Sequence, residues 1–109
     1  MVKSILSSEV KTIILACEAG MGSSLMSVNA LKKKLKKAKI NNVQVVHKPA
    51  REIPVTAQLV VVHKQLAKVA HGKAPDAIVV TFNNFFNDPA FDKLVDAFKT
   101  NAEIVDTAG

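Results

Sequence analysis

The chain has 109 residues, of which 49% are hydrophobic and 22% charged, and its formal net charge is +6. This length fits one domain, residues 1–109, because a second core would leave each half too small to be stable, and the composition excludes a disordered chain. No apolar run approaches the roughly 18 residues of a membrane span, and the N-terminus lacks the apolar stretch of a signal peptide. We therefore expect a cytoplasmic protein with no segment inserted into a membrane.

The first half of the chain alternates between strand and helix patterns. Two short apolar runs, residues 12–16 and 43–46, predict strands. Between them, residues 24–38 predict a helix, because apolar side chains recur along one stripe: Leu25, Val28, Leu31 and Leu35. Residues 48–57 contain two prolines, which favour an irregular crossover with at most one helical turn.

The second half continues the same alternation. Residues 59–62 and 77–80 are apolar throughout, which is typical of strands buried on both faces of a parallel sheet. Residues 64–71 predict a short helix, with Gly72 expected just past its end.

A last helix is predicted to begin at Asp88-Pro89, where Asp88 would be the N-cap and Pro89 the first helical residue. It continues through an apolar stripe formed by Phe91, Leu94, Val95 and Phe98. The tail, residues 101–109, has no clear pattern and is expected to be loosely held. The ordered core is therefore expected to cover about residues 11–100.

These elements together predict the fold class. The alternation indicates an α/β domain in which a four-stranded parallel sheet has helices on both faces, a three-layer sandwich of the Rossmann-like or small-phosphatase-like kind. Right-handed crossovers favour the strand order 2-1-3-4. In such a sheet, ligands bind at the carboxyl ends of the strands, beside the point where the strand order reverses.

The segment after the first predicted strand, ACEAGMGSS, has the composition of an anion-binding loop. Gly20 and Gly22 permit a tight turn, and Ser23 and Ser24 supply hydroxyl groups and can cap the next helix. Backbone N–H groups of such a loop and of the following helical turn bind anions. Cys17, the only cysteine, stands at the end of the strand, where we expect this field to lower the pKa of its thiol.

Two common nucleotide motifs do not fit this loop. The nucleotide P-loop requires lysine after its last glycine, but Ser23 follows Gly22. The dinucleotide fingerprint requires a third glycine where Leu25 stands, and an acidic residue where His47 stands. The single cysteine also excludes a cysteine-rich zinc site.

A third motif fits in part. The loop resembles that of the cysteine-type tyrosine phosphatases in Cys17 and Ser24, but Ser23 stands where their arginine is. Without arginine, the loop could hold a phosphoryl group on sulfur but would stabilise hydrolysis poorly. Asp88-Pro89 resembles the general-acid loop of the small phosphatases, although a helix start explains it better.

The segment ACEAGMGSSLMSVNALKKKL resembles the phosphocysteine loop and first helix of the enzyme IIB component of the sugar phosphotransferase system, mannitol type. The resemblance continues through LVVVHKQL and VTFNNFF, and so covers about residues 11–98. One departure is Glu18, where aspartate is commoner in this type.

The resemblance implies an enzyme, a protein-phosphohistidine–sugar phosphotransferase. Cys17 would take a phosphoryl group from a phosphohistidine of enzyme IIA and pass it to a sugar, mannitol or a related one, bound by the membrane enzyme IIC. The residues that would hold the phosphoryl group are those of the loop: Glu18, Ala19, Gly20, Met21, Gly22, Ser23 and Ser24. The resemblance implies neither a metal nor another cofactor for this step.

Alternatives stay open at this point. The same fold could serve as a regulatory phospho-acceptor of a transcriptional or signalling system. His63 ends the third predicted strand, where an imidazolium would help to hold a thiolate and a phosphate, or where the ring could simply be solvated or paired for structure. His47 is expected at the end of the second strand. The basic charge does not predict nucleic-acid binding, because the chain has one arginine and neither tryptophan nor tyrosine; an acidic or phosphorylated protein suits it better.

Overall fold

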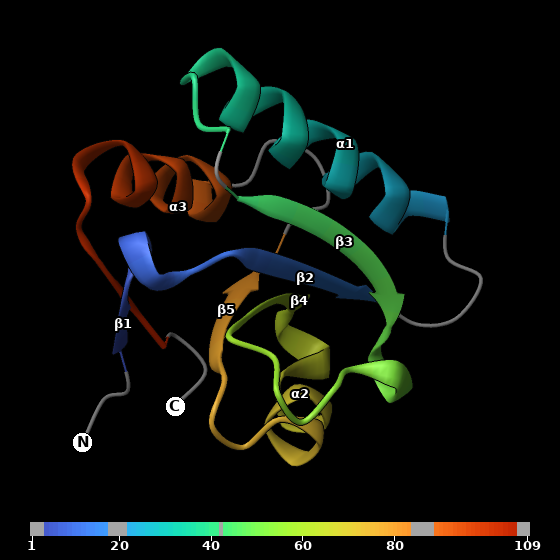
Figure 1. The fold of residues 1–109 in the computed structure, drawn as a ribbon. Coiled ribbons are helices and arrows are strands. Elements are labelled where there is room, and N and C mark those ends of the chain that lie inside the picture. Colours follow the sequence, from blue (N-terminus) through green and yellow to red (C-terminus); the bar gives the residue numbers. More distant parts are fainter. Residues whose placement is uncertain (1–3, 18–21, 42, 84–88, 107–109) are drawn as a thin grey trace.

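The computed structural model describes residues 4–17, 22–41, 43–83 and 89–106, and for residues 17 and 22–26 only the course of the backbone. Its centre is a four-stranded parallel sheet of β2 (Thr12–Cys17), β3 (Gln44–Pro49), β4 (Leu59–His63) and β5 (Ile78–Phe82), ordered β3-β2-β4-β5 (Figure 1). Counted along the chain within this sheet, that is the order 2-1-3-4, as predicted. The expected α/β class is confirmed.

The central strands are buried on both sides, which explains their lack of polar alternation. In β2, Ile13 and Leu15 belong to the core on one face, while Ile14 and Ala16 belong to the core on the other. Four successive residues of β4, from Leu59 to Val62, have no exposed surface. A strand that is apolar on both sides is stable only where helices cover both faces of the sheet.

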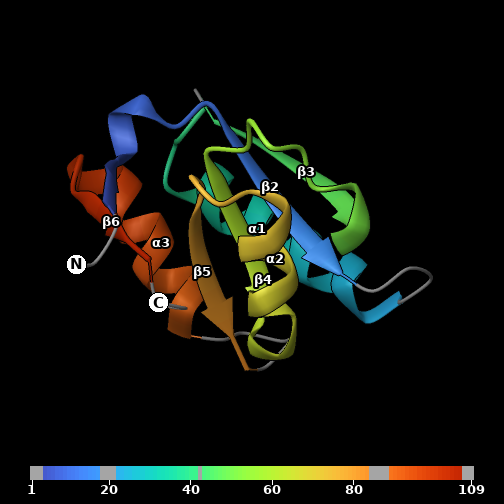
Figure 2. The same ribbon diagram turned by 90° about the horizontal axis from the view of Figure 1, so that it is seen from below.

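The helices form the outer layers (Figures 1 and 2). One face is covered by α1 (Gly22–Lys37) and α3 (Pro89–Thr100), which bury these residues of their predicted apolar stripes: Val28, Leu31, Leu35, Phe91, Leu94, Val95 and Phe98. The side chain of Leu25 and the predicted N-cap Asp88 lie outside the described residues, whereas Pro89 begins α3, as predicted. The other face is covered by α2 (Ala67–Lys73) and by the single 3-10 turn η2 (Ala50–Glu52), through Ala70, Ala50 and Ile53. No helix within the described residues is long and apolar enough to cross a membrane.

The end of α1 has a conformation that the sequence did not predict. Lys39 has φ 61°, its N–H bonds to the Lys36 carbonyl, and the N–H of Ile40 bonds to the Leu35 carbonyl. These two bonds form a Schellman motif, in which the left-handed position is usually glycine. At the end of α3, Asn101 has φ 55° and the Ala102 N–H bonds to the Ala97 carbonyl.

Gly72 lies inside α2 and does not follow its end, so the predicted helix boundary was wrong. The segment begins with a 3-10 turn, η3 (Lys64–Leu66), and α2 then runs to Lys73. The N–H of Ala74 still bonds to the Ala70 carbonyl, and both of these alanines are buried against the sheet. Packing therefore extends the helix past the glycine.

The two ends of the chain form a small second sheet, although no regular structure was expected in the tail. Strands β1 (Ser4–Leu6) and β6 (Glu103–Val105) pair antiparallel, with Ile5 opposite Ile104. Ser7 joins the end of α3, since its N–H bonds to the Ala102 carbonyl and its hydroxyl to the Ala97 carbonyl. Regular structure thus extends outside residues 11–100.

A buried carboxylate attaches this small sheet to the main one. The Asp106 side chain is 3% exposed, and its Oδ2 accepts the Val79 N–H at 3.1 Å. The same oxygen lies 3.1 Å from Nε2 of His71 in α2. Asp106 therefore joins the C-terminal segment to the outer edge of β5 and to a helix on the far face.

Candidate functional site

The candidate site lies at the carboxyl edge of the parallel sheet, where Cys17 is the last residue of β2. Cys17 stands opposite Pro49, the last residue of β3. Helix α1 begins at Gly22, so four residues separate the cysteine from the first residue of a 16-residue helix. A helix N-terminus thus follows the strand that carries the thiol after a connection of four residues, and anion sites of α/β proteins use this order of strand, loop and helix.

The predicted loop residues divide into two groups. Gly22, Ser23 and Ser24 form the start of α1, and no acidic residue occupies its first turn. An anion at this helix start would therefore meet no carboxylate of that turn. The others, Glu18, Ala19, Gly20 and Met21, lie outside the described residues.

His63 is placed beside the cysteine by the register of the strands. Ala16 of β2 lies opposite Val62 of β4, so His63 is level with Cys17 on the adjacent strand. His63 lies opposite Phe82, the last residue of β5, and Asn83 follows directly. The carboxyl ends of three neighbouring strands therefore contribute Cys17, His63 and Asn83 to one edge.

The contacts of His63 indicate the tautomer of its ring. Its Nδ1 accepts the Gln65 N–H at 3.2 Å, so this nitrogen carries no proton. Its Nε2 lies 3.1 Å from the Asn83 carbonyl oxygen, to which it must donate. The ring also meets Phe82 edge-on, with centroids 5.8 Å apart and planes at 86°. These contacts fix the orientation of the ring, with Nδ1 as the acceptor and Nε2 as the donor.

Sequence reasoning did not find the partners of His63. The contribution of Asn83 comes from a backbone carbonyl, which residue type does not reveal. Gln65 likewise contributes through its N–H. Of these contacts of His63, only the one with Phe82 is made by a side chain, whose type can be read from the sequence.

His47 does not end a strand, so that expectation was wrong. Strand β3 continues to Pro49, and His47 lies inside it, opposite Leu15. The strand runs on because its pairing with β2 extends as far as Cys17 and Pro49. Within the described parts of the chain, no group of three or more histidine, cysteine, aspartate or glutamate side chains is arranged to hold a metal ion.

Comparison with known proteins agrees with this architecture. Residues 12–97 match the family described as the lactose/cellobiose-specific IIB subunit of the phosphotransferase (PTS) system. The match covers most of the chain, from the first residue of β2 to the last turn of α3, and the chain therefore belongs to this family of IIB domains.

The names of individual relatives specify mannitol. The chain is 38% identical over 96 residues to the mannitol-specific EIICB component of Staphylococcus carnosus, covering 88% of this chain and 18% of that protein. It is 41% identical over 92 residues to the one from Staphylococcus saprophyticus, covering 84% and 18%. It is 40% identical over 88 residues to the mannitol-specific EIICBA component of Buchnera aphidicola, covering 81% and 14%. The chain thus spans less than a fifth of the length of these relatives.

Proposed function

We propose that this chain is the phosphoryl-transfer module of a sugar phosphotransferase system and that Cys17 carries the phosphoryl group. The observation that supports this most is the position of Cys17, at the end of the central strand β2 and separated by four residues from α1, in a chain that belongs to the IIB family. A thiolate there would be stabilised by the helix N-terminus, and so would the phosphate that it receives.

The proposed reaction has two displacements. In the first, the Cys17 thiolate attacks the phosphorus of a phosphohistidine on enzyme IIA; an S–P bond forms, the P–N bond breaks, and the imidazole keeps the electron pair and takes up the equivalent of the proton that the thiol lost, leaving as a neutral ring. In the second, a sugar hydroxyl oxygen attacks the same phosphorus, the S–P bond breaks, and the thiolate is restored as the hydroxyl loses its proton. Each step relies on in-line positioning and on N–H donors for the phosphoryl oxygens.

The loop composition supports transfer over hydrolysis. Ser23 stands where the phosphatases that the loop resembles have arginine. A phosphocysteine without that cation beside it gains less stabilisation of the transition state for attack by water. The group would then persist until an acceptor hydroxyl arrives.

The proposed acceptor is mannitol or a related sugar held by a membrane enzyme IIC, with the module itself on the cytoplasmic side. The relatives support this choice, because those named above are mannitol-specific EIICB and EIICBA components. The name of the matching family mentions lactose and cellobiose instead. Identity near 40% along most of the chain favours mannitol over those disaccharides.

A reconstituted relay tests both parts of the proposal. The chain is loaded from phosphorylated enzyme IIA and then mixed with membranes that contain a mannitol-specific enzyme IIC lacking its own IIB portion. Mannitol phosphate should form, and neither lactose nor cellobiose should replace mannitol. The Cys17→Ser variant, which has the same fold but a far weaker nucleophile, should form none. Undiminished transfer by Cys17→Ser would refute the role of the cysteine.

A further inference from the structure

The positive charge of the chain is concentrated in one segment. Residues 19–51 contain seven lysines, one arginine and no acidic residue, whereas the rest of the chain has seven basic and nine acidic residues. The net charge of +6 therefore arises entirely from this segment, which in the structure includes α1, β3 and the first two residues of η2. The molecule is electrostatically polarised, with α1 on its basic side.

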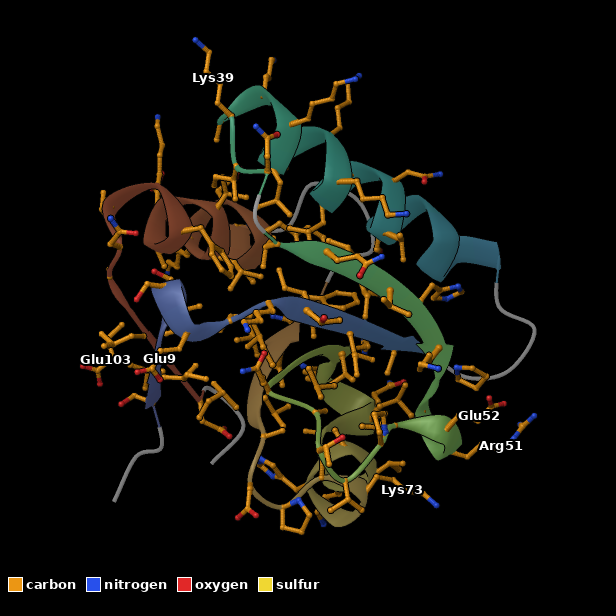
Figure 3. The ribbon with its side chains drawn as sticks, in the orientation of Figure 1. Glu9, Lys39, Arg51, Glu52, Lys73 and Glu103 are labelled. Atoms are coloured by element: carbon orange, nitrogen blue, oxygen red, sulfur yellow. The ribbon has the colours of Figure 1, made fainter. Side chains whose placement is uncertain are left out.

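Five of these lysines form a surface at the C-terminal part of α1, which we call the lysine face: Lys32, Lys33, Lys36, Lys37 and Lys39. All five are exposed, while Leu31 and Leu35 between them are buried against the sheet, so the lysines lie on the outward side of the helix. Figure 3 shows Lys39 pointing outward beyond the end of α1.

The lysine face is not neutralised by the neighbouring elements that the structure describes. The acidic residue that meets α1 is Asp92 of α3, and it pairs with Lys34 at 2.7 Å. Lys34 is directed toward α3 and does not belong to the lysine face. Among the described ion pairs, none engages a lysine of that face.

We propose that the lysine face docks the protein on an anionic phospholipid surface. Clusters of four to eight lysines on a helix are attracted to anionic headgroups, each charge contributing roughly equally near the surface. A charged layer requires no fixed donor geometry, so compact, mobile ammonium groups suit it well. The lysines extend from one side of a single rigid helix and can therefore approach a plane together.

The residue types favour lipid over the other anionic partners. Protein interfaces are depleted in lysine and enriched in arginine and aromatic residues, and nucleic-acid surfaces also use arginine and aromatics. The lysine face contains neither arginine nor an aromatic residue. Among the described residues, the large exposed apolar side chains are Leu6, Val55, Val69 and Val105, and none belongs to α1. Attachment would therefore be electrostatic and reversible by salt, without insertion.

Docking through this face leaves the candidate phosphoryl site accessible. Lys33 and Lys37 lie 11 and 15 residues after Gly22, which places them roughly 16–22 Å along the helix from its N-terminus at 1.5 Å per residue. With α1 lying along the membrane, the carboxyl edge of the sheet would face sideways. A membrane-held acceptor could then reach it.

Vesicle co-sedimentation tests the docking with a matched pair of variants. Lys33→Gln/Lys37→Gln removes two charges from the lysine face, and Lys68→Gln/Lys73→Gln removes two exposed lysines from α2 on the opposite side of the sheet (Figure 3). We expect wild-type protein to bind phosphatidylglycerol vesicles at about 0.1 M salt, where charges act over about 10 Å, and not phosphatidylcholine vesicles. Lys33→Gln/Lys37→Gln should weaken vesicle binding about 25-fold, which is about fivefold per lysine. Lys68→Gln/Lys73→Gln should weaken it by less than about twofold.

Three results would overturn the proposal: no preference for anionic vesicles, an equal loss in both double variants, or vesicle binding that is unchanged in Lys33→Gln/Lys37→Gln although this variant no longer binds enzyme IIA. The second would show that net charge alone is responsible, and the third that the partner is a protein. Thermal unfolding should be the same for both variants, and Lys32→Gln/Lys36→Gln replaces the first pair if it is not. Loading of Cys17 from phosphorylated enzyme IIA in solution should not change, so docking and phosphoryl transfer are tested separately.

Discussion

At the carboxyl end of β2, Cys17 occupies a position where the chain changes from buried strand to helix within a few residues. The usual lone cysteine is a small buried apolar residue. Here the strand pairing ends at that residue, opposite Pro49, and the helix N-terminus follows. In the proposed site, the field of the helix N-terminus would favour the thiolate form of Cys17.

The same field predicts how the thiol titrates. Because the helix N-terminus stabilises the thiolate over the thiol, its pKa should fall below the ordinary value of about 8.5. Iodoacetamide alkylation of Cys17 should therefore reach half of its maximal rate well below pH 8. Added inorganic phosphate should slow alkylation by occupying the site. A half-maximal pH near 8.5 with no effect of phosphate would contradict the anion site.

Among the helices, α1 and α3 both end at a residue in the left-handed conformation, but the two residues differ in type. Asparagine tolerates that conformation, as at Asn101, whereas lysine does so only at a cost. The cost at Lys39 is met by the packing of the chain that follows, since Ile40 and Val43 pack against the main core. A helix end of this kind is determined by tertiary contacts and not by local preference.

Replacing Lys39 with glycine should therefore stabilise the protein. Lys39→Gly removes the strain of φ 61°, and the free energy of unfolding should rise by about 1 kcal/mol in urea denaturation. The control Asn101→Gly should gain less. A loss of stability in Lys39→Gly would mean that the left-handed conformation is not the one adopted in solution.

Replacing Gly72 in α2 is a second change that should stabilise the protein. Gly72 lies within α2, is exposed, and a Cβ added to it would meet nothing within 4 Å. Gly72→Ala should raise the unfolding free energy by about 0.5–1 kcal/mol, because alanine loses less backbone entropy in a helix. A lower midpoint of thermal unfolding would place the end of α2 before residue 72, where the sequence had suggested it.

At the scale of the whole molecule, the two ends of the chain are held against the main sheet through β1, β6 and Asp106. The sheet and its main helices could be predicted because whole runs such as 59–62 are apolar and the stripes of α1 and α3 repeat at helical spacing. The small sheet could not, because in each three-residue strand only the middle residue, Ile5 or Ile104, faces the core. The contacts of His63 and Asp106 could not either, since they depend on backbone groups brought together by folding.

Asp106 should therefore matter to global stability despite its place near the end of the chain. Asp106→Ala leaves the buried N–H of Val79 without its acceptor and His71 without its carboxylate, and it should lower the unfolding free energy by about 1–3 kcal/mol. Asp76→Ala, at an exposed position, should change it by less than about 0.5 kcal/mol. Equal effects of the two changes would show that the C-terminal segment is not anchored.

The central claim concerns a single covalent bond between phosphorus and the sulfur of Cys17. Phosphorus NMR of the protein after incubation with phosphorylated enzyme IIA tests it most directly. We predict one protein-bound resonance at a thiophosphate position, absent from the Cys17→Ser variant and lost when enzyme IIC and mannitol are added. A resonance typical of phosphohistidine, or the same signal in Cys17→Ser, would contradict it.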